Sequence, residues 1–398
     1  MLLGCLQLIQ FQYEISTVST VSFIKAFPVP QDTLFQPLKV GAVTLRNRIV
    51  MAPMTRSRAD NPDKAATDLT AQYYGQRASA GLIITEGTQV SEGGQGYLYT
   101  PGIYSERQTE AWKKVTKAVH DKGGLIAAQL WHVGRISHTS VLPKGLPPVA
   151  PSDIRANATT FALDENGTPG QVPTSEPYAL SAHRGIPTVV FEFAQAARNA
   201  IEAGFDLVEL HGANGYLLAQ FLSPDANQRT DQYGGSLENR ARFVLEVLDA
   251  VIAAVGADRV GIRLSPWAPQ FINDIDGTVE AEATTLYLAE QFEKRGIAYL
   301  HMAEWGQDIY PDGFRQRLRD TYKGAILYAG GYDQPKAEAL LETGTADAVA
   351  FGVPFIANPD LPERFQEGSP LAEADKATFY GGGAEGYTDY PDRNGQAA

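Results

Sequence analysis

The sequence predicts an α/β fold, a (β/α)8 TIM barrel with a capping hairpin inserted after the third strand. Eight short apolar runs lack the alternation of polar residues that half-exposed strands have, so each is expected to be covered on both faces. Segments with helical spacing of apolar residues separate these runs, and this order implies parallel strands joined by right-handed crossovers. Eight such units close a barrel more naturally than they form a doubly wound sheet, which is the alternative.

The expected strands are short runs of mostly aliphatic residues. In chain order they are residues 48–52, 81–85, 125–129, 205–210, 260–263, 298–302, 325–328 and 348–351. Several follow a glycine that we expect to end the preceding helix in a left-handed conformation, namely Gly81, Gly204, Gly296 and Gly344.

Helices are expected where apolar residues recur at three- and four-residue spacing, because this spacing puts them on one face. The clearest sets are Trp112, Val115 and Val119, then Phe193, Ala197 and Ala200, and then Phe243, Val244, Val247, Leu248 and Val251.

One connection is too long for an ordinary barrel loop. Residues 131–185 are rich in proline and polar residues, and Glu165-Asn166-Gly167 tolerates the positive φ angles of a hairpin turn. We expect this segment to cap the mouth of the barrel. The tail at residues 367–398 is rich in glycine, and its composition alone is typical of a flexible linker.

Residues 1–31 are expected to be an extension outside the fold, and residues 32–398 a single barrel domain. The apolar start faintly resembles a signal peptide, but no basic residue precedes it and Glu14 follows soon after. We favour a non-native or frayed extension. The single cysteine, Cys5, excludes an intrachain disulfide and any thiolate metal site, and it is compatible with a cytoplasmic location.

Charge and histidine spacing exclude further classes of function. The formal charge of −13 repels nucleic acid and anionic membranes, so neither is an expected partner. His132, His138 and His301 lack the spacing of zinc ligands, and we expect them to be structural. No metal site is predicted.

Three hydrogen-bonding side chains follow the fourth expected strand. His211, Asn214 and Tyr216 come directly after the run that ends at Leu210. In a parallel barrel the active site lies at the carboxyl ends of the strands. These residues could therefore face the barrel mouth, with Tyr216 as a proton donor.

The sequence that continues from this motif, Leu217 to Arg240 with its Asp231-Gln-Tyr-Gly-Gly235, resembles the Old Yellow Enzyme family of flavin-dependent ene-reductases. The similarity extends from about Leu34 to Pro391 and is greatest to the bacterial members named for reducing N-ethylmaleimide and nitrate esters. It implies FMN as the cofactor and NADPH or NADH as the reductant. It also implies that His211 and Asn214 bind the substrate carbonyl, that Tyr216 donates the proton, and that the glycine-rich C-terminal segment folds near the flavin site.

The resemblance also implies which residues bind the flavin. In the family the threonine of the motif that contains Pro53 and Thr55 hydrogen-bonds flavin O4, and Gly87 lies in the same site. Gln129 has an amide that can both donate and accept, which suits the edge of the isoalloxazine ring.

A charged residue lies inside the fifth expected strand. Arg263 either pairs with an inward carboxylate such as Glu209 or, as the resemblance implies, lies against flavin N1 and O2. Trp131 could be a core residue or a pocket residue, and Tyr97 could be a loop aromatic or one that narrows the substrate pocket.

The phosphate site is expected after the last two strands. Gly330, Gly331 and Gly352 would allow backbone amides to approach a phosphate, near a short helix that begins around Pro354. The family ordinarily has arginine after the Phe-Gly pair, whereas this chain has Val353. This substitution predicts weaker binding of FMN.

The predicted function is reduction of the C=C bond of electrophilic alkenes by an FMN enzyme that uses a reduced nicotinamide, as a monomer or homodimer. Two alternatives stay open. One is a plant-type oxylipin reductase, which would act on a cyclopentenone fatty acid. The other is a flavin-binding barrel with little turnover.

Overall fold

The computed structural model describes residues 33–269, 273–306 and 309–396. The predicted extension of residues 1–31, with Cys5, lies outside the described residues. Among the residues described, no helix is both long and apolar enough to cross a membrane.

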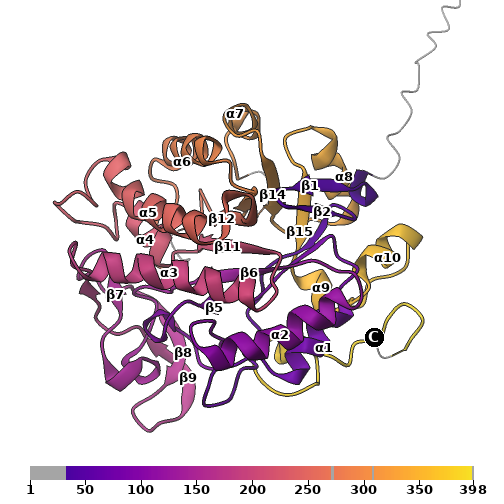
Figure 1. Ribbon diagram of the computed structural model, residues 1–398, viewed down its shortest axis with the longest axis horizontal. Helices are drawn as coiled ribbons and strands as arrows, with labels where there is room; N and C mark the ends of the chain where they lie inside the picture. The colour runs from indigo at the N-terminus through magenta and orange to yellow at the C-terminus, as the bar shows by residue number, and fades with distance from the viewer. Residues whose placement is uncertain (1–32, 270–272, 307–308, 397–398) are drawn as a thin grey trace, which may run out of the picture. The chain divides into compact units, whose positions relative to one another are not determined.

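Eight parallel strands form a closed barrel, as predicted (Figure 1). Neighbouring strands pair in the order of the chain, and β6 pairs with β11 on its other side, so that the ring is continuous. The short strand β5 (Thr88–Gln89) pairs with the end of β6. The barrel strands are β3 (Ile49–Met51), β4 (Leu82–Ile84), β6 (Ile126–Trp131), β11 (Leu207–Gly212), β12 (Val260–Leu264), β13 (Tyr299–Ala303), β14 (Ala325–Ala329) and β15 (Ala348–Phe351).

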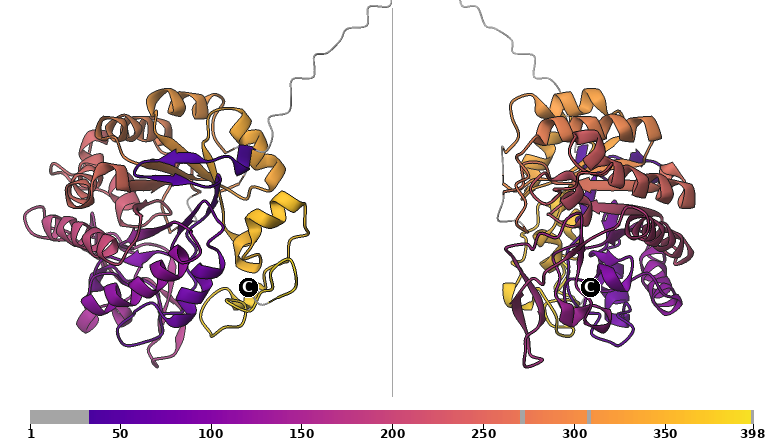
Figure 2. Two further views of the ribbon diagram at one scale, coloured as in Figure 1. Left: turned by 45° about the vertical axis from the view of Figure 1, so that its right-hand side comes forward. Right: turned by 90° about the vertical axis from the view of Figure 1, so that its left-hand side faces the viewer.

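Helices connect successive strands and cover the outside of the barrel (Figures 1 and 2). Serine and threonine caps begin several of them, as in α1, where the Thr67 side chain accepts from the backbone N–H of Thr70. The helices are α1 (Asp68–Gln76), α2 (Glu106–His120), α3 (Gly185–Glu202), α4 (Leu217–Leu222), α5 (Leu237–Val255), α6 (Ala281–Arg295), α7 (Phe314–Thr321), α8 (Gln334–Glu342), α9 (Val353–Ala357) and α10 (Leu361–Glu367).

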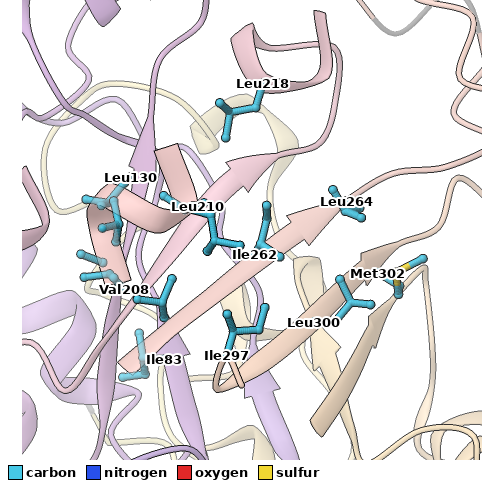
Figure 3. Packing of buried hydrophobic residues seen from close by; sticks show 14 of the residues in the cluster. Ile83, Leu130, Val208, Leu210, Leu218, Ile262, Leu264, Ile297, Leu300 and Met302 are labelled. Atoms are coloured by element: carbon cyan, nitrogen blue, oxygen red, sulfur yellow. The ribbon is translucent and has the colours of Figure 1, made fainter. Parts of the chain in front are cut away.

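Alternate side chains of the barrel strands pack into two separate apolar clusters, one outside and one inside the barrel. Val208, Leu210 and Ile262 belong to the larger apolar cluster, which joins the strands to the helices (Figure 3). The residues between them point into the barrel, where a second cluster includes Leu207 and Tyr299. Complete burial of one such aliphatic side chain stabilises a fold by about 1.5–3 kcal/mol.

An antiparallel hairpin packs against this inner cluster. It consists of β1 (Leu38–Val40) and β2 (Val43–Leu45), and the buried side chains of Val40 and Leu45 join the inner core. The hairpin turn meets the chain just before β12, where the N–H of Ala42 donates to the carbonyl oxygen of Asp258 at 2.7 Å. The hairpin therefore lies at the amino ends of the strands, and the polar residues of the inner face can gather at the opposite, carboxyl end.

Three of the four junction glycines behave as predicted and one does not. Gly204, Gly296 and Gly344 have φ angles of 92°, 63° and 71°, in the left-handed region. Gly81 does not have a positive φ, so that prediction is wrong. Space explains the glycine there, because a Cβ atom would lie 2.1 Å from the carbonyl oxygen of Asn47.

The connection between β6 and α3 contains the capping hairpin. Its strands, β8 (Thr159–Leu163) and β9 (Pro169–Pro173), pair antiparallel, and Gly167 in the turn has a φ of 76°. A second pair, β7 (Val149–Ala150) and β10 (Tyr178–Ala179), is parallel.

The glycine-rich C-terminal segment binds to the loop after β3. The Arg56 guanidinium donates hydrogen bonds of 2.9 Å to the carbonyl oxygens of Phe379 and Gly386. Tyr387 is buried and stacks on Tyr73, with ring centroids 4.1 Å apart. Figure 2 shows this yellow segment beside the indigo and purple α1 region. Although its composition is typical of a flexible linker, the C-terminal segment therefore makes specific contacts with the rest of the barrel domain.

Candidate active site

A cavity of about 280 Å³ opens at the carboxyl ends of the barrel strands. The loops after β3 and β4, the ends of β6, β11 and β12, helix α9 and the C-terminal segment line it. Most of the predicted site residues meet here, namely Pro53, Thr55, Gly87, Gln129, Trp131, His211, Asn214, Tyr216, Arg263 and Val353.

The remaining predicted residues lie outside this cavity's lining. Tyr97 lines an adjoining cavity that also includes Tyr216. Gly330, Gly331 and Gly352 line neither of these two cavities. Gly352 does precede α9, whose first residue, Val353, contributes to the lining.

Strand register brings five polar residues together inside the barrel. Glu209 on β11 lies opposite Gln129 on β6, and Arg263 on β12 lies opposite both His211 and His301. The carboxylate of Glu209 accepts a hydrogen bond of 2.8 Å from the Gln129 amide and another of 2.8 Å from His301 Nδ1. This network orients the Gln129 amide in the cavity wall.

The hydrogen-bonded network of Glu209, Gln129 and His301 carries one negative charge. Burial by itself would raise the pKa of Glu209, but His301, Arg263 and Gln129 stabilise the carboxylate, and the pKa lies below its usual value. Burial lowers the pKa of His301. At neutral pH the pair is therefore an ionised carboxylate and a neutral imidazole whose Nδ1–H is the donor.

Within the described part of the chain, the buried side-chain Nε of Arg263 has no hydrogen-bond partner, and the guanidinium forms no ion pair within 4 Å. The salt bridge to Glu209 considered from the sequence is absent, because that carboxylate is engaged by Gln129 and His301. A guanidinium and an amide donor at one wall fit the electron-rich edge of an isoalloxazine ring. The residues present therefore fit a flavin.

His211 is positioned to donate from one defined ring nitrogen. Its Nδ1 accepts from the backbone N–H of Ala213 at 3.4 Å, so in the neutral ring Nε2 carries the proton. Burial, together with the positive charge of Arg263, holds the pKa of His211 well below its usual value. The imidazole is thus a neutral donor at the cavity.

The backbone of Asn214 is held in a left-handed conformation with a φ of 57°. Its N–H donates to Ser265 Oγ at 2.8 Å, and its carbonyl oxygen accepts from the Asn273 amide at 2.6 Å. Within the described residues its buried Oδ1 has no hydrogen-bond partner. The loop after β12 thereby fixes the backbone of a residue whose own amide stays available.

Tyr216 stands among three other rings. Its ring centroid lies 5.0 Å from that of His211 and 5.0 Å from that of Trp131, both edge-to-face. Trp131 stacks on Tyr97 at 5.7 Å, and the Tyr97 hydroxyl lies 3.2 Å from the Tyr216 hydroxyl. Burial raises the pKa of the Tyr216 phenol above its usual value, and hydrogen bonds from Tyr97 and Asn273 oppose that rise.

A buried carboxylate that the sequence did not reveal supports the Thr55 loop. Glu86 precedes Gly87 and accepts hydrogen bonds from the backbone N–H groups of Arg56 and Ser57, at 3.2 and 3.4 Å. Burial raises the pKa of Glu86 to about 7. Gly87 is required by space, since a Cβ atom would lie 2.4 Å from the Trp131 ring.

Glu209 was considered in the sequence only as a partner of Arg263. One signal could have identified its place, because Glu209 and His211 are two residues apart and therefore face the same side of one strand. When a polar residue lies inside an apolar strand, two residues before a site residue, its side chain is expected to face the interior of the barrel as the site residue does.

Known proteins resemble this chain over most of its length. Residues 33–372 match the model of the NADH:flavin oxidoreductase / NADH oxidase family. A putative 12-oxophytodienoate reductase 5 from Oryza sativa subsp. japonica is 47% identical over 362 residues, 88% of this chain and 92% of the relative. A probable flavin mononucleotide-dependent alkene reductase from Leishmania infantum is 44% identical over 364 residues, 90% of this chain and 97% of the relative.

A solved structure also resembles this chain over most of its length. The structure of morphinone reductase in complex with tetrahydroNAD superposes with a TM-score of 0.86 at 54% identity, covering 90% of this chain and 97% of that one. The family model and these identities extend far beyond what a shared barrel alone would give. The chain therefore belongs to the NADH:flavin oxidoreductase family, the Old Yellow Enzyme family, and is an FMN-dependent NAD(P)H oxidoreductase of the alkene-reductase type.

Proposed function

We propose that the enzyme reduces the C=C bond of α,β-unsaturated carbonyl and nitro compounds, with His211 and Asn214 as oxygen-binding donors and Tyr216 as the proton donor. The observation that carries this proposal is the pairing of His211 with Tyr216 at one cavity, with ring centroids 5.0 Å apart. His211 can bind the carbonyl or nitro oxygen of the substrate while Tyr216 reaches the alkene carbon next to that electron-withdrawing group.

Several residues of the cavity would hold FMN. Thr55, Gln129 and Arg263 would bind the ring, and the start of α9 at Val353 would lie toward the phosphate end with Gly330, Gly331 and Gly352. When bound and reduced, FMN supplies the hydride that the alkene carbon accepts. The positive charge of Arg263 favours negative charge on a neighbouring ring.

The oxygen of the substrate is held by neutral donors. His211 Nε2–H is free to donate because Nδ1 already accepts from the backbone of Ala213. The Asn214 amide supplies the second donor. Both hydrogen bonds strengthen as negative charge develops on the oxygen, so they lower the energy of the transition state more than that of the bound substrate.

The proton comes from the Tyr216 hydroxyl. The raised pKa of Tyr216, caused by burial, keeps the phenol protonated at neutral pH. The hydroxyl of Tyr97, 3.2 Å away, can donate to the oxygen of Tyr216 as the proton leaves. Tyr97 is therefore proposed to act through Tyr216 as well as to narrow the pocket.

Anaerobic stopped-flow kinetics of Tyr216→Phe test this assignment. Flavin reduction by NADH or NADPH needs no proton from Tyr216 and should keep its rate, whereas reoxidation by an enone should slow by roughly 100- to 10,000-fold. Tyr178→Phe, at an exposed residue of the cap, is the matched control. Equal losses in both half-reactions would remove Tyr216 from this role.

An oxylipin reductase is the second candidate, supported by the identity of 47% to the putative 12-oxophytodienoate reductase from Oryza sativa subsp. japonica. It would use the same donors on a cyclopentenone. A barrel that binds flavin with little turnover is the third reading, motivated by Val353. Turnover of any simple enone at catalytic enzyme concentration excludes the third reading.

A further inference from the structure

A second cavity, of about 600 Å³, adjoins the first. Thr55, Tyr216 and Tyr380 line both cavities, so the two spaces meet at the proposed proton donor. No step proposed above uses the second space. A molecule that reacts beside Tyr216 can extend into it.

Aromatic rings from three distant segments line this second cavity. Tyr97 and Tyr99 come from the loop after β5, Phe161 from strand β8 of the cap, and Tyr380 from the C-terminal segment. Tyr99 and Phe161 meet edge-to-face with ring centroids 6.4 Å apart. Tyr380 is 69% exposed although it is aromatic, so most of its ring is free to contact a ligand.

The backbone holds these rings in place. Tyr99 has a φ of 65°, which is uncommon for a bulky residue, and its carbonyl oxygen accepts from the N–H of Ala59 at 2.9 Å. The N–H of Leu98 donates to the carbonyl oxygen of Phe161 at 2.9 Å, which ties the cap to the loop. Backbone in rare conformations clusters at ligand-binding sites, and here it adjoins a cavity wall.

None of the described residues that line the cavity carries an ionic side chain. Its polar side chains are hydroxyls and the amide of Gln171. A pyrophosphate or a carboxylate would have no cationic partner there, and the chain as a whole carries a charge of −13. Planar uncharged groups, in contrast, stack favourably on tyrosine and phenylalanine rings.

We propose that this cavity is a binding subsite for the distal part of the electrophile, and that the enzyme prefers enones bearing an aromatic or fused-ring substituent over small aliphatic ones. The reacting alkene lies beside Tyr216, and the substituent lies between Phe161, Tyr99 and Tyr380. This inference rests on the proposed function and adds the substrate class to it.

Two enones that differ only in the substituent on the β-carbon test the subsite. Benzylideneacetone carries a phenyl ring where ethylideneacetone carries a methyl group. The measured quantity is the ratio of their kcat/KM values in the holoenzyme. Phe161→Ala and Tyr380→Ala should each lower this ratio by about 10-fold, the loss expected for one aromatic contact. Tyr178→Ala, an exposed aromatic of the same cap outside both cavities, should leave the ratio unchanged.

Two results would overturn the subsite. The first is equal loss for both enones in the Phe161 and Tyr380 variants. The second is slower flavin reduction by NADH or NADPH at an unchanged ratio, which would assign the cavity to the dinucleotide.

A binding measurement tests the subsite independently of the proposed function. If the wild-type enzyme reduces neither enone, the perturbation of the flavin spectrum by naphthol and by phenol measures binding without turnover. Tighter binding of naphthol that is lost in Phe161→Ala supports the subsite, and equal binding of the two compounds overturns it.

Discussion

The hydroxyl oxygens of Tyr97 and Tyr216 lie 3.2 Å apart, although 119 residues separate them in the chain. Tyr97 belongs to the loop after β5, and Tyr216 precedes α4. Both residues line the second cavity, so the contact joins the proposed proton donor to a neighbour in the same wall. It also gives the donor a partner that can stabilise its conjugate base.

Tyr97→Phe should slow flavin reoxidation by an enone about 10-fold and leave reduction by the nicotinamide unchanged. Loss of the hydrogen bond raises the pKa of Tyr216 further above its usual value, since burial already raises it. In wild type the active form is the neutral phenol, so the reoxidation rate should be constant from about pH 6 to 9 and fall only in stronger alkali. A rate that falls between these limits would contradict the assignment.

His211→Ala and Asn214→Ala should each weaken the binding of phenols to the oxidised enzyme. A hydrogen bond to a charged oxygen contributes about 1.5 to 3 kcal/mol, which corresponds to roughly 10- to 100-fold in Kd. Titration followed by the long-wavelength band of the flavin measures the change. Undiminished binding in both variants would place the oxygen site elsewhere.

Glu209→Gln should raise the midpoint potential of the bound flavin by on the order of 30 mV. The isosteric amide keeps an acceptor for His301 but removes a negative charge that partly offsets Arg263, so negative charge on the reduced flavin is favoured more strongly. Potentiometric titration checks this, with Asp249→Asn at an exposed surface acid as the control. A lower or unchanged potential would show that the network acts only through geometry.

Val353→Arg should tighten FMN binding by roughly 10- to 100-fold, because a guanidinium can make two charge-assisted hydrogen bonds to the phosphate. Val353 is 54% exposed at the start of α9, so a longer side chain can be accommodated. Fluorescence quenching during titration of the apoprotein gives the Kd, and Val353→Leu is the control. Wild-type binding already at low nanomolar Kd, with no gain in the arginine variant, would mean that other groups replace the missing charge.

The barrel could be predicted because each strand and helix has a characteristic local pattern of apolar residues in the sequence. Apolar runs such as the one that ends at Leu210 identified the strands, and the polar residues directly after that run identified the site. The residues of the motif from His211 to Tyr216 are close in sequence, so their convergence required only that one strand end be located.

Contacts that depend on register and on distant segments could not be predicted in this way. Glu209 meets Gln129 and His301 because three separate strands align, and no local pattern encodes that alignment. The C-terminal segment binds Arg56 through its backbone carbonyl groups, which every sequence possesses. The sequence predicted a left-handed backbone at Gly81, whereas the structure explains this glycine by its close contact with Asn47. Both causes require glycine, so the sequence alone cannot distinguish them.

The most direct test of the proposed chemistry is the position of solvent-derived hydrogen in the product. The enzyme reduces an enone in D2O with unlabelled NADH or NADPH, and NMR locates the deuterium. Proton donation by Tyr216, whose hydroxyl exchanges with solvent, predicts one deuterium on the carbon adjacent to the carbonyl group and none on the β-carbon. Deuterium on the β-carbon, or a product without deuterium next to the carbonyl, would contradict the account.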